Sequence, residues 1–179
     1  MSRAIVVLLS GPNLDLLGER EPEVYGRGTL ADHVARATAT AERLGLQLQH
    51  VQSNHEGTLI EAVHSARGSA AALVVNAGAL THTSWALHDA LAAFEGVVIE
   101  LHLSNPAARE PFRHTSVIAP VADGSIAGFG GLGYELAIEA VRALLQTSPL
   151  AEAETSPPAE AEISPPAEAQ TSEQSEATR

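Results

Sequence analysis

Three short runs made mostly of apolar residues constrain the fold of this chain most strongly. They span residues 4–9 (AIVVLL), 71–76 (AALVVN) and 97–103 (VVIELHL), and each is followed by polar or turn-forming residues. A strand with one face in water alternates apolar and polar residues, whereas these runs barely alternate. Runs of this kind, rich in β-branched residues, are typical of strands covered on both faces in a parallel sheet.

Helical periodicity fills the segments between these runs. In residues 29–44, apolar side chains recur every three or four positions, Thr29 is a candidate N-cap, and Gly45 is a candidate stop signal. Thr58 and Glu61 have capping-box spacing, which predicts a second helix to about Arg67. Further helices are predicted over about 84–94 and from the glycine-rich segment 128–133 to about 145.

The remaining strands complete an alternating pattern. Residues 46–52 alternate leucine with glutamine, which favours a place near a sheet edge, and both 116–119 and 125–127 have strand-like composition. Alternating strands and helices with right-handed crossovers predict an α/β fold of flavodoxin-like type, a doubly wound five-stranded parallel sheet with helices on both faces. Ligands of such folds bind beyond the carboxyl ends of the strands.

Residues 147–179 differ from the rest in composition. SPPAEAE at position 156 and SPPAEAQ at position 164 repeat with a period of eight, and few apolar residues accompany them. Such a segment cannot bury enough surface to fold. We therefore expect a catalytic domain over residues 1–146 and a disordered acidic tail over 147–179.

Composition excludes several classes of function. The net charge of −12 argues against nucleic acid or an anionic membrane as partner. Cysteine is absent, and all ten basic residues are arginine, so neither a thiolate nucleophile nor a lysine Schiff base is available. The sequence shows neither a signal peptide nor a membrane-spanning run, which favours the cytoplasm.

The long polar segment 10–26 follows the first strand. Gly11, Pro12, Gly18 and Pro22 interrupt it, so we expect neither helix nor strand there. Loops of this length inside compact domains are often active-site lids, although a solvated surface loop is the alternative. Asn13, Arg20 and Tyr25 give this loop an amide, a guanidinium and a phenol.

The strand at 97–103 carries a second candidate group. Glu100 and His102 are two residues apart, so both side chains leave the same face of the strand, and Ser104 continues that row. A buried carboxylate needs a partner because burying it unpaired costs several kcal/mol. The pair is therefore either a structural ion pair or a carboxylate that orients a catalytic histidine. A metal site is a weaker interpretation, since no third ligand is evident.

Two further motifs give weaker indications of function. Gly128, Gly130 and Gly133 fit G-x-G-x-x-G, but they open the last helix rather than the first βα unit, which favours close helix packing or an anion site over a dinucleotide. His82, Ser84 and Asp89 supply the residue types of a hydrolase triad, yet no G-x-S-x-G elbow surrounds the serine. A catalytically silent flavodoxin-like binding module for small molecules remains an alternative.

Six motifs in order along about residues 4–145 resemble type II 3-dehydroquinate dehydratase. They are GPNL at 11, REPEVYG at 20, QSNHEG at 52, NAGALTHTS at 76, ELHLSN at 100 and REPFR at 109. The resemblance implies a lyase that dehydrates 3-dehydroquinate to 3-dehydroshikimate without metal or cofactor, in the shikimate pathway or in quinate catabolism. The type I enzyme of the same reaction uses a lysine, which this chain lacks.

The resemblance also implies roles for individual residues. Tyr25 would be the base, Arg20 and Arg109 would lower its pKa, and Asn13 would hold the water that stabilises an enolate. His102, oriented by Glu100, would protonate the departing hydroxyl. The implied substrate-binding residues are Asn76, His82, Leu103, Ser104, Arg109 and Arg113, together with Asp89 from a neighbouring subunit. The family assembles as trimers within a homododecamer.

Overall fold

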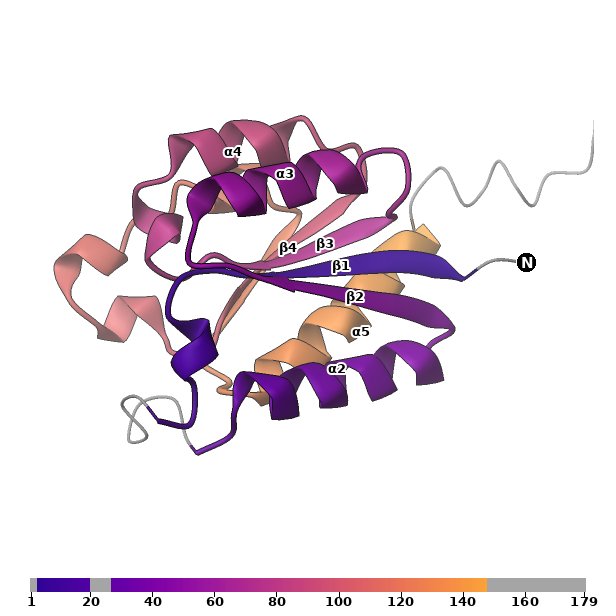
Figure 1. Cartoon of the computed structure of the whole chain (residues 1–179), viewed down its shortest axis with the longest axis horizontal. Helices are drawn as coiled ribbons and strands as arrows, with labels where there is room; N and C mark the ends of the chain where they lie inside the picture. Colours follow the sequence, from indigo (N-terminus) through magenta and orange to yellow (C-terminus); the bar gives the residue numbers. More distant parts are fainter. Residues whose placement is uncertain (1–2, 20–26, 148–179) are drawn as a thin grey trace, which may run out of the picture.

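The computed structural model describes residues 3–19 and 27–147, and it contains a five-stranded, all-parallel sheet (Figure 1). The strand order is β2-β1-β3-β4-β5, so the predicted doubly wound, flavodoxin-like architecture is confirmed. β2 lies at an edge of the sheet, as its alternating leucines and glutamines predicted. The strands are β1 (Ala4–Ser10), β2 (Leu46–Gln52), β3 (Ala72–Asn76), β4 (Val97–His102) and β5 (Gly124–Ala127).

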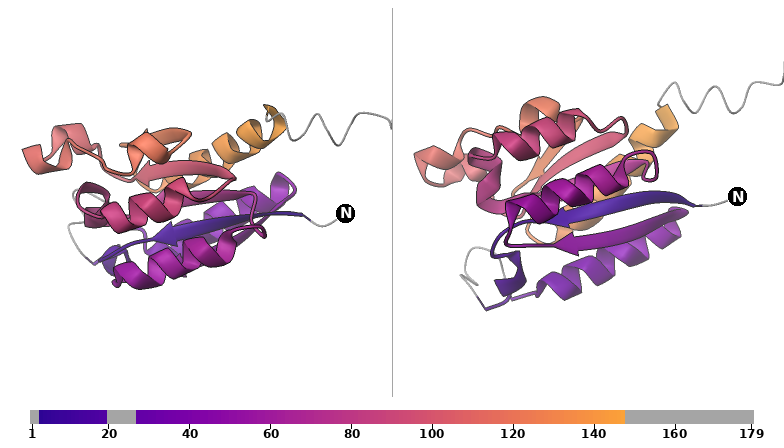
Figure 2. Two further views of the ribbon diagram at one scale, coloured as in Figure 1. Left: turned by 90° about the horizontal axis from the view of Figure 1, so that it is seen from above. Right: turned by 45° about the horizontal axis from the view of Figure 1, so that its top comes forward.

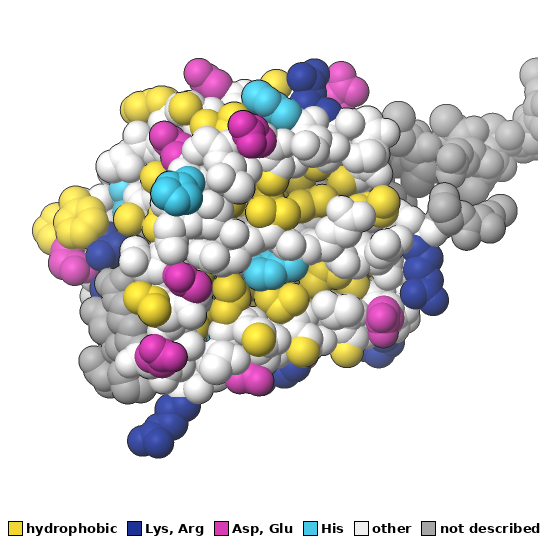
Figure 3. Space-filling model, viewed as in Figure 1, with side chains coloured by type: hydrophobic (Ala, Val, Ile, Leu, Met, Phe, Trp, Pro, Cys, Tyr) yellow, Lys and Arg dark blue, Asp and Glu magenta, His cyan; other side chains and the backbone are white. Residues whose placement is uncertain are grey.

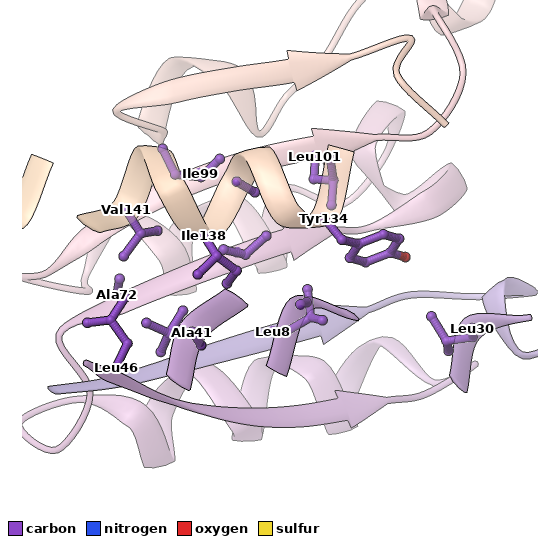
Figure 4. Packing of buried hydrophobic residues seen from close by; sticks show 14 of the residues in the cluster. Leu8, Leu30, Ala41, Leu46, Ala72, Ile99, Leu101, Tyr134, Ile138 and Val141 are labelled. Atoms are coloured by element: carbon purple, nitrogen blue, oxygen red, sulfur yellow. The ribbon is translucent and has the colours of Figure 1, made fainter. Parts of the chain in front are cut away.

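Within residues 3–19 and 27–147, four α-helices cover the two faces of the sheet (Figure 2). They are α2 (Leu30–Arg43), α3 (Glu56–Ala66), α4 (Trp85–Ala92) and α5 (Leu132–Thr147). α2 and α5 pack on one face, where Leu8, Ile99 and Ile138 belong to one core cluster (Figure 4). α3 and α4 pack on the other face around Leu73. In Figure 3, hydrophobic side chains are visible along the seams between the sheet and the helices.

The helix starts show where local sequence signals succeed and fail. Thr29 caps α2 as predicted, and its side chain forms a reciprocal capping box with Asp32. The capping box predicted from Thr58 and Glu61 is wrong, because α3 already begins at Glu56. The α3 cap residue, His55, makes no side-chain cap bond. Instead, Glu56 accepts a hydrogen bond from Ser84 at the start of α4, so a tertiary contact fixes this helix end.

Two loop predictions also need correction. Residues 116–119 do not form a strand: the hydroxyl of Ser116 accepts the backbone N–H groups of Ile118 and Ala119, and this turns the chain into a 3-10 segment. The first loop contains a 3-10 turn at Leu14–Leu16, although we expected no helix there. Leu14 and Leu17 are buried in the core, which explains why this polar segment is locally ordered.

A backbone contact joins the carboxyl ends of β1 and β3. Ser10 is in register with Asn76, and the N–H of Gly11 donates to the Asn76 carbonyl at 2.8 Å. A side chain at Gly11 would overlap the carbonyl group of Ala77, so only glycine fits. This contact brings the loop after β1 against the loop after β3, where the predicted site residues are found. Within 3–19 and 27–147, no helix is long and apolar enough to cross a membrane.

Candidate active site

A pocket opens at the carboxyl ends of β1, β3 and β4. It brings together most of the predicted site residues that the structure describes, namely Asn13, Asn76, His82, His102, Leu103, Ser104, Arg109 and Arg113. The rest of its lining is mainly apolar or glycine, with Pro12, Leu14, Leu17, Gly78, Ala79 and Pro106. A few convergent polar groups in an otherwise apolar cavity are typical of a site for a small molecule.

The predicted pair on β4 forms as expected. Nε2 of His102 lies 3.2 Å from Oε1 of Glu100, which is only 3% exposed. Burial works to raise the pKa of Glu100, but hydrogen bonds from His102, Ser116 and Ser125 outweigh it and lower the pKa below the usual value. An ionised Glu100 fixes the orientation of the imidazole, and the other ring nitrogen, Nδ1, is left for the pocket.

Asn13 has an unusual backbone at the mouth of the pocket. Its φ of 66° is the only left-handed value among the non-glycine residues that the structure describes. Asparagine tolerates this conformation better than most residues, but surrounding contacts must still hold it. Asn54 supplies one: its Oδ1 accepts the Asn13 N–H at 2.8 Å, while its Nδ2 donates to Asp15 at 3.1 Å.

His82, which also lines the pocket, has a fixed tautomer. Its Nδ1 lies 2.7 Å from the backbone oxygen of Thr115, and only a protonated nitrogen can bond a carbonyl. The edge of Phe112 contacts the same ring at a centroid distance of 6.1 Å. With Nδ1 used in this way, Nε2 is the nitrogen available to a ligand.

Two arginines place positive charge beside the pocket. Nε of Arg113 lies 2.8 Å from a Glu110 carboxylate oxygen, and Nε of Arg109 lies 3.3 Å from the same oxygen. Arg109 also donates to the hydroxyl of Ser104 at 3.4 Å. Guanidinium groups beside a pocket suit an anionic ligand.

Arg20 and Tyr25 lie outside the described residues. Asp89 is exposed on α4 and does not line the pocket. Ser84 is buried as the cap of α4, where it accepts the Leu87 N–H, so the alternative hydrolase triad finds no support.

The glycine motif at the start of α5 serves packing. A Cβ on Gly133 would meet the side chain of Leu101 at 2.9 Å, so this glycine lets α5 approach β4 closely. Of the two alternatives considered for the motif, this observation favours close packing. In residues 3–19 and 27–147 there is no cluster of three or more His, Asp or Glu that could hold a metal ion.

Sequence reasoning missed several residues that support the site. Ser116 and Ser125 both donate to Glu100, and Ser125 is the direct cross-strand neighbour of Glu100. Tyr134 lies 58 positions from Asn76, yet its hydroxyl contacts the Asn76 amide. Asn54 lies in the QSNHEG motif at position 52 and could have been found from it. Ser116, Ser125 and Tyr134 carry no local sequence signal.

The fold and the pocket define a doubly wound α/β protein with an acid–base pair at the carboxyl edge of its sheet. The family model described as dehydroquinase class II matches residues 4–142. The chain belongs to this family.

Curated relatives agree with this family assignment. The chain is 50% identical over 146 residues to a 3-dehydroquinate dehydratase of Dinoroseobacter shibae, covering 82% of this chain and 97% of the relative. It is 52% identical over 139 residues to a 3-dehydroquinate dehydratase of Corynebacterium glutamicum, covering 78% and 96%.

Solved structures show the same fold. The type II dehydroquinase of Butyrivibrio crossotus superposes with a TM-score of 0.77 at 38% identity, covering 79% of this chain and 99% of that one. The corresponding enzyme of Propionibacterium acnes superposes with a TM-score of 0.76 at 39% identity and the same coverage. Resemblance, family and fold therefore agree.

Proposed function

We propose that this protein is a lyase that dehydrates 3-dehydroquinate to 3-dehydroshikimate, in the shikimate pathway or in quinate catabolism. The observation that carries the proposal is the buried Glu100–His102 pair facing a pocket that also holds Asn13 and Asn76, in a chain of the class II dehydroquinase family. The reaction needs a base, a stabiliser for an enolate and a proton donor, and no cofactor.

The elimination proceeds in two steps. A base removes the C2 proton, and the electron pair moves onto the C3 ketone oxygen to give an enolate. When the enolate collapses, the C1–O bond breaks, the C1=C2 double bond forms, and the ketone returns. His102 donates a proton to the departing hydroxyl, which leaves as water. Glu100 holds the imidazole in place for this transfer and balances its charge.

Tyr25 is the base in this proposal, and Arg20 assists it. A free tyrosine has a pKa of ~10, so only about 0.1% is ionised at pH 7, a deficit of roughly 4 kcal/mol. A neighbouring guanidinium favours the phenolate and lowers that deficit. Asn13 holds the water that donates to the enolate oxygen. The positive charge of Arg109 and Arg113 next to the pocket supports binding of the anionic substrate.

The remaining contacts fix the substrate. Asn76, His82 and Ser104 bind its polar groups, and the backbone N–H groups of Leu103 and Ser104 face its carboxylate. The lining of the described pocket by these four residues supports this part of the proposal.

We also propose that the chain works in the cytoplasm as a homododecamer, a tetramer of trimers in which Asp89 reaches a neighbouring site. Asp89 is exposed on α4 and lies one turn beyond Trp85, which is 63% exposed. Residues four apart share one helix face, so an exposed tryptophan and a carboxylate lie together there. Light scattering would contradict this proposal if the active species were a monomer.

The direct test of function is to incubate the purified full chain with 3-dehydroquinate in EDTA and to follow the absorbance of the conjugated enone product. We expect turnover in EDTA and no inactivation by borohydride. The matched variant is His102→Ala. Because His102 acts after the enolate has formed, this variant should retain exchange of the C2 proton for deuterium to a greater extent than formation of the product. A protein that binds substrate without releasing product would instead be the silent binding module.

A further inference from the structure

The hydroxyl proton of Ser116 has one direction open to it. The oxygen accepts the backbone N–H of Ile118 at 3.0 Å and that of Ala119 at 2.9 Å. A hydroxyl oxygen has two acceptor lone pairs and one proton, and these two bonds use both lone pairs. The proton is therefore donated to Oε1 of Glu100, which lies within hydrogen-bond distance.

The bond from Ser116 reaches the same carboxylate oxygen that His102 contacts. Nε2 of His102 lies 3.2 Å from Oε1 of Glu100, and the second oxygen, Oε2, accepts from Ser125 at 2.7 Å. A donor on each oxygen restricts rotation of the carboxylate, so Oε1 stays on the side of the imidazole. Ser125 is exposed on the edge strand β5, where water can replace its bond, whereas Ser116 is half-buried.

The residues on both sides of Ser116 bond to a different part of the site. The carbonyl of Thr115 accepts the Nδ1 proton of His82 at 2.7 Å. On the other side, the N–H of Val117 donates to the Thr81 carbonyl at 2.9 Å. Thr81 and His82 belong to the 3-10 segment that follows β3. Ser116 thus stands between the acid–base pair on β4 and the loop that carries His82.

The turn that Ser116 closes bears on the direction of the Thr115 carbonyl. The two N–H bonds to the hydroxyl hold residues 116–119 in a turn. The carbonyl belongs to the peptide that joins Thr115 to Ser116, so its direction depends on the backbone of Ser116. His82 donates to this carbonyl from Nδ1, which leaves Nε2 for the ligand. One serine side chain therefore acts on two groups of the pocket.

We propose that Ser116 is a positioning residue for two groups of the site: its hydroxyl fixes the Glu100 carboxylate, and the turn that it closes fixes the carbonyl to which His82 donates. The inference deepens the proposed function, because it rests on a pocket in which His102 protonates the departing hydroxyl and His82 binds the substrate. Ser116 touches no substrate itself. It acts on kcat through Glu100 and on KM through His82.

The first test is Ser116→Ala, which removes the hydroxyl. We expect kcat to fall about tenfold and KM for 3-dehydroquinate to rise about threefold, effects of the size of one hydrogen bond each. Ser116→Thr keeps a hydroxyl and should return both constants to near the parent values. Ser125→Ala removes a donor to the same carboxylate but closes no turn, so it should lower kcat less and leave KM unchanged. Ser65→Ala, an exposed serine on α3, should change neither constant.

A Glu100→Gln background separates the two effects. The carboxylate that Ser116 fixes is absent there, so Ser116→Ala should lower kcat no further, yet it should still raise KM. A further fall in kcat of the same size would show that Ser116 does not act through Glu100, and it would overturn the inference. An unchanged KM in Ser116→Ala would overturn it as well, because the link to His82 would be absent.

A second readout does not depend on turnover. Burial acts to raise the pKa of Glu100, but the bonds from His102, Ser116 and Ser125 lower it below 4.5. Of these three groups, His102 is the one that titrates. The bond from Ser116 to the ionised carboxylate therefore stabilises the fold above pH 4.5 and weakens as Glu100 gains a proton.

The melting temperatures of the parent and Ser116→Ala should accordingly differ most at neutral pH, and the difference should shrink in acid. Part of it should persist, because the two backbone N–H groups lose their acceptor at every pH. If Ser116→Ala does not fold, Ser116→Cys gives the same readout, since a thiol is a weaker donor and acceptor. A difference that is constant with pH would overturn the inference. Absence of turnover in the parent protein would contradict the proposed function alone.

Discussion

Asn54 controls the geometry of the pocket mouth although it is not one of the proposed catalytic residues. Its side chain accepts the N–H of Asn13 and so helps to hold that residue in a left-handed conformation. We expect Asn54→Ala to lower kcat about tenfold, because a small misplacement of Asn13 weakens a preorganised site. Steady-state kinetics would check this, with the exposed Gln49→Ala on β2 as control. Unchanged kinetics in Asn54→Ala would show that other contacts suffice.

Substitution of Tyr25 distinguishes between two roles of the loop after β1, namely taking part in the chemistry and only covering the pocket. Tyr25→Phe removes the ionisable oxygen, so kcat should fall by at least about 10²-fold, as for loss of a general base, while substrate affinity changes little. Arg20→Ala should also lower kcat and move the acidic limb of the pH–rate profile to higher pH, because the phenolate loses a stabilising cation. A near-normal kcat in Tyr25→Phe would redirect the search for the base to His82 or His102.

Glu100 links the site to the acid stability of the protein. Its pKa is lower in the folded chain than the ordinary value of 4.5, so its ionised form stabilises the fold above that pH. This contribution is lost as the pH falls below 4.5 and through the folded pKa. The melting temperatures of the parent and Glu100→Gln should therefore differ most at neutral pH and converge in acid. Thermal unfolding across that range checks this, and a constant difference would contradict it.

At the scale of elements, the contact between β1 and β3 depends on Gly11. Gly11→Ala should destabilise the protein by about 1–3 kcal/mol, the usual cost of overpacking, because the new methyl group overlaps the Ala77 carbonyl. Gly57→Ala in α3 is the matched control: nothing lies within 4 Å of its Cβ position. That change should be neutral or stabilise by up to about 1 kcal/mol. Urea unfolding of both variants measures the difference.

Elements that bury a continuous apolar face were predictable from sequence. Residues 72–76 and 97–102 form strands with neither face fully exposed to solvent. The apolar periodicity of α2 and its Thr29 cap predicted the bounds of that helix closely. The errors occur where one side chain decides the local backbone. Ser116 turns a segment of strand-like composition into a 3-10 turn, and a bond from Ser84 holds the first turn of α3.

The site was predictable only in part. Neighbouring positions such as Glu100 and His102 follow from strand geometry, because a separation of two places both on one face. Asn76 and Tyr134 come together only through the packing of α5 on the sheet, and Ser125 meets Glu100 only through the register of β4 and β5. No local pattern encodes such contacts between distant segments.

For the molecule as a whole, we expect residues 148–179 to be dispensable for folding and turnover. The repeated SPPAEA segments provide no periodic apolar face that could pack on the domain. A chain ending at Thr147 should keep the melting temperature and the kcat of the full chain. Differential scanning calorimetry and the enone assay test this, and a large loss of either would assign the tail a role in the domain.

The order of strands in the sheet gives the substrate a part in folding. β1, the first strand made, lies between β2 and β3, and the pocket needs the ends of β1, β3 and β4 together with the arginines that follow. The residues that line the pocket run from Pro12 to Arg113, so a ligand favours forms in which β1, β3 and β4 are already assembled over forms in which they are not. At a concentration 100 times its Kd, it adds about 2.7 kcal/mol to the free energy of unfolding. Supply of substrate would then slow the loss of the enzyme to proteolysis.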